Sequence, residues 1–190
     1  MASFQLYIPL LNAAEGGYQN LVGDSGNYNS LGQRVGTNHG ISAKTYENWI
    51  KRPPTVNDMK SMSKAEALKI YKLWYWDKLG ADHINNQSVA DILADHGVNA
   101  GIVAAGKLIQ RTLNDYFNFN LVVDGVVGPQ TRNAINSVNE AQLHSVIKKE
   151  REKFYYSIGG EFLDGWLNRL KIFVFSEKKK HCSQCGQLLA

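Results

Sequence analysis

Apolar residues recur at helical intervals through most of the 190-residue sequence, and this recurrence limits the chain to a mainly helical fold. One clear stretch follows Ser63 and Glu66, which have capping-box spacing, and predicts a helix of about four turns. Its apolar stripe consists of Leu68, Tyr71, Tyr75 and Leu79. Because period-two patterns are nearly absent, we predict a mainly α fold with little strand.

Similar patterns predict helices over 3–14, from Ser88, from Gly101 to Leu113, from Pro129, over 140–158 after a cap at Asn139, and over 162–175. In the first of these, Pro9 either kinks the helix or marks its start. From Asn20 to Gly40 the composition turns to Gly, Asn, Ser and Asp. We expect a small irregular loop or hairpin there.

The composition is that of a folded globular protein, with 44% hydrophobic and 20% charged residues. The net charge of +4 favours an anionic partner, which could be nucleic acid, a membrane surface or a cell wall. Lys and Arg are scattered rather than clustered, so nucleic-acid binding is not expected. No stretch approaches the length of a membrane span, so no membrane insertion is expected.

The N-terminus lacks a basic region, and Gln5 and Pro9 interrupt its apolar stretch, so we predict no signal peptide. The protein is then expected to be made in the cytoplasm. Cys182 and Cys185 lie too close together to staple the fold, and with His181 they look like half of a zinc ribbon. Three ligands do not close a tetrahedral site, so we expect a mobile tail and no metal, with zinc bound between two chains as the alternative.

Glu15 lies where a mostly apolar helix meets Gly16-Gly17. A helix C-terminus disfavours a charged carboxylate, which suits an acid that must stay protonated to donate to a leaving oxygen. The paired glycines leave room for a bulky sugar chain. The alternative is an ordinary surface carboxylate at a helix end.

The segment Glu15-Gly16-Gly17-Tyr18, followed by Thr37-Asn38-His39-Gly40-Ile41, resembles the signature of the glycoside hydrolase family 108 lysozymes. The resemblance extends from residue 4 to about residue 170 and includes Tyr75-Trp76, Asp95, Val98-Asn99-Ala100-Gly101, Gln110, Asp124-Gly125, Arg151, Tyr155 and Gly165-Trp166-Leu167. It implies a lysozyme-like helical fold with the loop or hairpin near the active site. It also implies that Glu15 is the catalytic acid.

The stretch between Tyr18 and Thr37 is longer than in relatives and lacks their tight Gly-Gly turn. Asp24 lies within it, nine residues after Glu15, a separation that resembles that of the two acidic residues in phage-type lysozymes. We therefore name Asp24 as the candidate second catalytic carboxylate. An Asp that only caps the Ser25-Gly26 turn is an equal alternative.

Thr37, Asn38 and His39 offer hydrogen-bonding groups that could position water or contact sugar hydroxyls, although they could equally shape a turn. Tyr18 could stack on a sugar ring or belong to the core, and the same two roles are open to Tyr28, Tyr46 and Trp49. Asp95 and Asn99 share a helix face, which buried hydrogen bonding explains at least as well as catalysis.

The segment Asp124–Thr131 resembles the DGxxGxxT unit of peptidoglycan-binding modules, so we assign it to wall recognition, alongside a local role as a helix-start turn. The predicted organisation is a catalytic region over 1–98, a peptidoglycan-binding helical region over 99–175 and a mobile tail over 176–190.

As the resemblance implies, we expect a monomeric, cofactor-free N-acetylmuramidase that cleaves the β-1,4 bond between N-acetylmuramic acid and N-acetylglucosamine in peptidoglycan. It would act on the wall after release or export. The alternative is a non-catalytic wall-binding or secretion-associated protein on the same fold.

Overall fold

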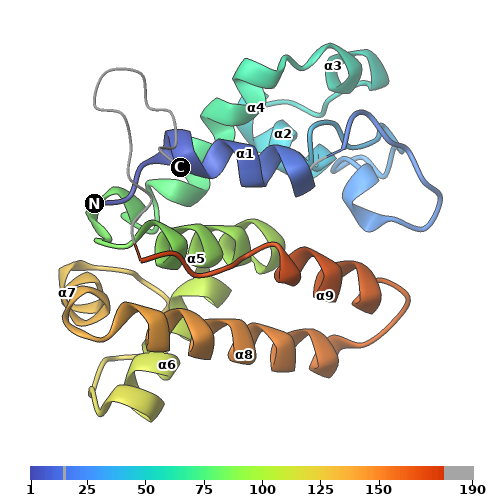
Figure 1. Cartoon of the computed structure of the whole chain (residues 1–190). Helices are drawn as coiled ribbons and strands as arrows, with labels where there is room; N and C mark the ends of the chain where they lie inside the picture. Colours follow the sequence, from blue (N-terminus) through green and yellow to red (C-terminus); the bar gives the residue numbers. More distant parts are fainter. Residues whose placement is uncertain (15, 178–190) are drawn as a thin grey trace. The chain divides into compact units, whose positions relative to one another are not determined.

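The computed structural model describes residues 1–14 and 16–177, which form helices joined by loops (Figure 1). Glu15 and residues 178–190, with Cys182 and Cys185, lie outside the described residues. In the described part, β pairing is limited to isolated bridges. The predicted mainly helical class is therefore confirmed. The chain forms two compact units, a smaller one over residues 11–71 and a larger one that combines residues 1–10 with the chain from residue 72.

Helix α1 (Phe4–Ala14) contains Pro9 in its interior, so the helix does not begin at the proline. Phe4 and Tyr7 are buried, and their rings lie 5.7 and 5.6 Å from the ring of Trp76 within the larger unit. Aromatic contacts of this kind bury a large apolar area. They anchor the first turns of α1.

The smaller unit contains the short 3-10 helix η1 (Ser25–Asn27) and the helices α2 (Ala43–Ile50), α3 (Val56–Ser61) and α4 (Lys64–Tyr71). Single antiparallel bridges join Gln19 to Thr37, Tyr28 to Arg34 and Asn38 to Ile41. The stretch before α2 is thus the irregular hairpin that its composition predicts. Ser42 caps α2, and Thr55 forms a complete capping box with Asp58 at the start of α3.

The helix predicted after Ser63 differs from expectation at both ends. Ser63 Oγ accepts a hydrogen bond from the Glu66 amide (3.1 Å), but the Glu66 carboxylate does not return to Ser63. It accepts bonds from the Tyr46 hydroxyl and the Trp49 indole instead, so only half of the box forms. Beyond α4 the chain continues as a π-helical turn, η2 (Lys72–Trp76), where the Asp77 amide donates to the Lys72 carbonyl (2.8 Å).

The larger unit is built around α5 (Gln87–Ala100), whose residues 87–97 are all buried. The other elements of this unit are the 3-10 helix η3 (Ala81–His83), α6 (Ile102–Phe117), α7 (Pro129–Ser137), α8 (Glu140–Ile158) and α9 (Leu163–Lys171). Helices α6 and α8 pack against α5, and α9 packs against α8 (Figure 1). Pro129 is the first residue of α7, and Asn139 caps α8, as predicted.

A buried ion cluster holds this unit together. Arg151 of α8 is fully buried and donates to Asp95 Oδ2 (2.6 Å), the Ile92 carbonyl (2.9 Å) and the Tyr155 hydroxyl (2.6 Å). Arg169 of α9 pairs with the other Asp95 oxygen at 2.7 Å. Asp95 therefore has the buried hydrogen-bonding role that was predicted as the alternative to catalysis. Three helices are joined at one carboxylate.

Within residues 1–14 and 16–177, no helix is both long enough and apolar enough to cross a membrane.

Candidate active site

The loop between α1 and α2 carries most of the residues predicted for the site. Gln19 and Thr37 pair through two backbone hydrogen bonds of 2.9 Å, which brings the segment after Tyr18 beside the one that starts at Thr37. Gly36 has φ +91° and lies under the Tyr18 ring, where an added Cβ would come within 2.6 Å of a ring carbon. Only glycine suits this position, because φ is positive and the ring leaves no space. The Tyr18 hydroxyl donates to the Val35 carbonyl (3.1 Å).

A polar network centred on Gln19 connects Asp24 with Thr37. The Gln19 amide nitrogen donates to Asp24 Oδ2 (2.8 Å), and its oxygen accepts from Asn27 Nδ2 (3.0 Å). Thr37 Oγ1 in turn donates to the oxygen of the buried Asn27 side chain (2.8 Å). Each member fixes the orientation of the next. The hairpin therefore has a rigid polar interior despite its irregular backbone.

Asp24 caps the short helix η1, since its Oδ1 accepts from the Gly26 amide (2.8 Å). The capping role is thus present in the structure. Together with the bond from Gln19, it engages both carboxylate oxygens. A catalytic role for Asp24 remains a prediction beside this structural one.

Asn38 and His39 both shape the turn that follows. The buried Asn38 side chain donates to the Met59 carbonyl (2.8 Å), and its backbone pairs with Ile41. His39 adopts φ +48°, in the left-handed region, and its carbonyl accepts from the Tyr71 hydroxyl (3.0 Å). The turn-shaping alternative therefore holds for both residues. Their contact with substrate remains a prediction.

A small cavity of about 70 Å³ lies within the smaller unit. Gly16 and His39 both line it, so it brings together the two segments that carry the family resemblance. The other lining residues are Leu11, Asn12, Lys64, Ala67, Leu68 and Tyr71. The cavity is therefore a small recess beside Gly16.

Two hydrogen bonds to the Glu66 carboxylate, which we call the Glu66 clamp, were not predicted from the sequence. Tyr46 donates to Glu66 Oε2 (3.2 Å) and Trp49 to Oε1 (3.0 Å), which joins α2 to α4. Burial and the negative charge of Glu66 raise the pKa of Tyr46. Tyr46 is thus a core residue bonded to a carboxylate, as the core alternative for the aromatic residues allowed. The Lys60 ammonium lies 5.2 Å from the centre of the Tyr18 ring.

Every described carboxylate of the smaller unit is committed to a structural hydrogen bond. Besides Glu15, the unit has four acidic residues, which are Asp24, Glu47, Asp58 and Glu66. Glu47 accepts from the Ser30 amide and hydroxyl, and Asp58 accepts from Arg52 and Thr55. Asp24 and Glu66 hold η1 and α2 as described above. No group of three His, Cys, Asp or Glu side chains able to hold a metal ion occurs in residues 1–14 and 16–177.

Two family models match this chain. Residues 8–101 match the model described as glycosyl hydrolase 108, and residues 104–171 match the one described as a predicted peptidoglycan domain. The first half of the chain thus belongs to the glycosyl hydrolase 108 family. The two matches together indicate a peptidoglycan hydrolase with peptidoglycan as its ligand.

The fold is similar to the solved structure of Brucella abortus SagA, with 25% sequence identity, 90% of each chain covered and a TM-score of 0.76. The predicted lysozyme-like helical fold is therefore confirmed. No curated protein matches the chain.

Proposed function

We propose that this glycosyl hydrolase 108 protein is an N-acetylmuramidase that hydrolyses the β-1,4 bond between N-acetylmuramic acid and N-acetylglucosamine, with Glu15 as its general acid. The observation that carries the proposal is the match of residues 8–101 to the glycosyl hydrolase 108 model, together with the resemblance of Glu15-Gly16-Gly17-Tyr18 to the signature of that family. The other four acidic side chains of the smaller unit, Asp24, Glu47, Asp58 and Glu66, each accept structural hydrogen bonds. Gly16, the neighbour of Glu15, lines the recess that His39 also lines.

In this mechanism Glu15 donates its proton to the glycosidic oxygen as the bond to the anomeric carbon breaks. Water then adds to that carbon through its oxygen, and the proton that it releases passes back to the Glu15 carboxylate, which restores the acid form. Asp24 is the proposed second carboxylate, which stabilises the positive charge or orients the water. Although both of its oxygens accept one hydrogen bond, a carboxylate has about four lone-pair sites, so acceptor capacity remains.

The residues proposed to contact substrate differ in how exposed their side chains are. Tyr18 and Thr37 are half-buried and therefore offer a ring face and a hydroxyl to a saccharide. Asn38 is buried with its amide engaged, so its proposed contribution is to hold the turn on which His39 lies. His39 would contact the sugar through its half-buried side chain.

Glu15→Gln tests the assignment, because an amide keeps the size of the side chain but cannot donate a proton as an acid. Loss of general-acid help typically lowers the rate by about a hundredfold to ten-thousandfold, so clearing of purified walls should nearly vanish. Thermal unfolding should change little or shift upward, because the carboxylate removed directly follows, in sequence, the last residue of α1. Product analysis of the wild-type digest should show new reducing ends on muramic acid.

Glu47→Gln makes the same chemical change in the same unit at an exposed hairpin contact and should leave wall clearing intact. Sedimentation with walls but no clearing by Glu15→Gln would support the proposal. Near-wild-type clearing by a folded Glu15→Gln protein would falsify it. Wall binding without hydrolysis by the wild-type protein would instead favour the non-catalytic alternative.

A further inference from the structure

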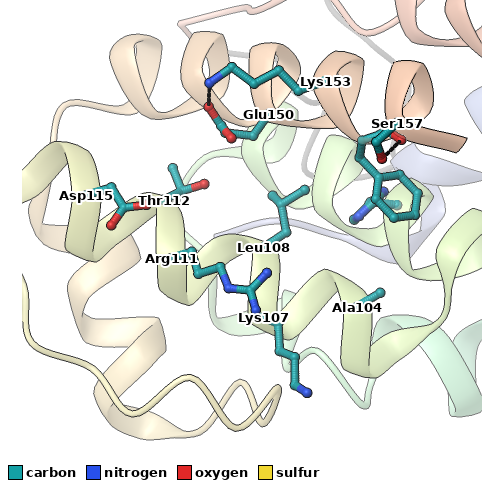
Figure 2. Close-up of a pocket in the computed structure, with 11 residues that line it drawn as sticks. Ala104, Lys107, Leu108, Arg111, Thr112, Asp115, Glu150, Lys153 and Ser157 are labelled. Carbon is teal, nitrogen blue, oxygen red and sulfur yellow. Dashed lines mark hydrogen bonds and ion pairs between the residues drawn. The ribbon is translucent and has the colours of Figure 1, made fainter.

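A pocket of about 450 Å³ lies between α6 and α8 in the larger unit (Figure 2). Its volume falls within the range of about 300–1,000 Å³ that is usual for small-molecule sites. Its lining residues come from 104–157, within the part of the chain that matches the peptidoglycan domain, except for His96 of α5. Leu108 and Phe154 supply apolar surface at its wall.

Two buried polar groups line this pocket without a hydrogen-bond partner. His96 and Thr112 are each 1% exposed, and neither His96 Nδ1 nor Thr112 Oγ1 has a partner among the described residues. The His96 ring meets Phe154 edge-on at 5.1 Å, and burial with the charge of Arg151 lowers the pKa of His96 to about 3. Buried polar groups are normally paired, so two unpaired ones in the lining of one pocket mark a place where a ligand can add bonds.

The rim of the pocket carries three charged side chains that have no partner within the part of the chain that the structure describes. Lys107, Arg111 and Asp115 of α6 make no hydrogen bond or ion pair with any described residue, whereas Lys153 of α8 pairs with Glu150 at 2.7 Å. Figure 2 shows the α6 side chains across the pocket from Glu150 and Lys153. A ligand that meets this rim therefore gains most if it has carboxylates for two cations and an amine for one carboxylate.

We propose that this pocket binds the peptide stem of peptidoglycan. The inference rests on peptidoglycan being the substrate of the proposed hydrolase. N-acetylated glycan strands are uncharged, because the lactyl carboxylate of each muramic acid is consumed in the amide bond to the peptide. The stem holds the carboxylates, amides and, where a diamino acid is present, the amine. Lys107 and Arg111 bind its carboxylates, and Asp115 binds the amine.

Thr112 supplies the hydrogen bond to the peptide backbone. Thr112 lines the pocket, and its hydroxyl has no hydrogen-bond partner among the described residues. Leu108 and Phe154 contact the alanine methyl groups of the stem.

The segment Asp124–Thr131 has a different place in this unit. A Cβ on Gly106 of α6 would fall 2.0 Å from the Gly125 carbonyl oxygen, so the two backbones touch. Gln110 donates to Asp124 Oδ1 (2.8 Å) and accepts from the Gly125 amide (2.8 Å). These contacts fix the segment against the α6 face that carries Gly106 and Gln110, and the pocket residues Leu108, Arg111 and Thr112 follow a separate stripe of the helix.

Calorimetric titration of the full chain with N-acetylmuramyl-L-alanyl-D-glutamyl-meso-diaminopimelate tests the proposal, with chitotriose as the uncharged sugar for comparison. Arg111→Ala and Lys107→Ala should each weaken binding of the muramyl tripeptide by roughly tenfold to a hundredfold, because each removes a charge-assisted bond. Lys149→Ala is the matched control, since it removes the same charge from an exposed position of α8 outside the pocket. It should leave binding unchanged.

Thr112→Val separates a ligand role from a structural one. Replacing an unpaired buried hydroxyl with a methyl group should leave thermal stability equal or higher, yet weaken binding of the tripeptide. Equal affinity in Arg111→Ala, Lys107→Ala and wild type would overturn the proposal. So would chitotriose binding with the same sensitivity to these variants, because the pocket would then recognise glycan.

The experiments distinguish a failure of the peptide-stem proposal from a failure of the muramidase proposal. The muramyl tripeptide contains no bond between N-acetylmuramic acid and N-acetylglucosamine, so its binding is measured without hydrolysis. Tripeptide binding that depends on Arg111, in a protein that clears no walls, supports the stem site and contradicts the muramidase. Wall clearing without tripeptide binding supports the muramidase and contradicts the stem site.

Discussion

Replacing Arg151 with leucine should cost about 3–5 kcal/mol of unfolding free energy, the usual penalty for breaking a buried ion pair from one side. The fully buried guanidinium donates to Asp95, the Ile92 carbonyl and the Tyr155 hydroxyl, so Arg151→Leu leaves three groups short of a partner at once. Asp95 retains Arg169, which keeps the cost within that range rather than above it.

Urea unfolding followed by far-ultraviolet circular dichroism measures this change. Lys153→Leu is the control, because Lys153 lies two residues further along α8 and pairs with Glu150 at an exposed position, where ion pairs contribute little. A loss below about 1 kcal/mol for Arg151→Leu, the range of exposed pairs, would refute the reasoning.

Asp24→Asn should lower wall clearing less than Glu15→Gln does, because the Thr37 hydroxyl shares in water positioning; equal inactivity in a folded variant would make Asp24 an essential partner. Gly106→Ala should lower stability by about 1–3 kcal/mol, since its Cβ would fall 2.0 Å from the Gly125 oxygen. An unchanged melting temperature would contradict that close packing. The pKa of His96 falls from 6.5 to about 3 on folding, so the unfolded state binds the extra proton and stability is lost as the pH falls through that window. Urea titrations across it should show a slope up to about 1.4 kcal/mol per pH unit steeper for wild type than for His96→Gln, and equal slopes would count against a neutral buried imidazole.

Long helices were predictable from the sequence because each must bury one apolar stripe. This held for α1, α5, α6 and α8, whose stripes are visible at helical spacing. Helices α2 and α3 were missed, since they span 8 and 6 residues and are signalled mainly by their caps, Ser42 and Thr55. The π-helical turn after Tyr71 was also missed, because side-chain spacing does not reveal which carbonyl a backbone amide selects.

The site could be located from the sequence but not assigned in detail. The two segments that carry the resemblance contribute Gly16 and His39 to one recess, and the assignment of His39 to a substrate site stays a prediction. Whether Asp24 caps a turn or acts in catalysis depends on where Gln19 and Gly26 lie, and no local pattern encodes that. The pocket between α6 and α8 was not predicted, because residues such as Lys107 and Arg111 have the pattern of an ordinary solvated helix face.

The Glu66 clamp also allows the two compact units to be followed separately by spectroscopy. The chain has four tryptophans, and Trp49 is the one whose sequence position falls in the smaller unit, while Trp74, Trp76 and Trp166 belong to the larger. Because the Trp49 indole donates to Glu66, its resonance senses the link between α2 and α4 directly. Uniform labelling with 5-fluorotryptophan would therefore give one fluorine signal that follows saccharide binding near the hairpin. The other three would report on the larger unit, where the Trp166 ring stacks on Tyr155 of α8.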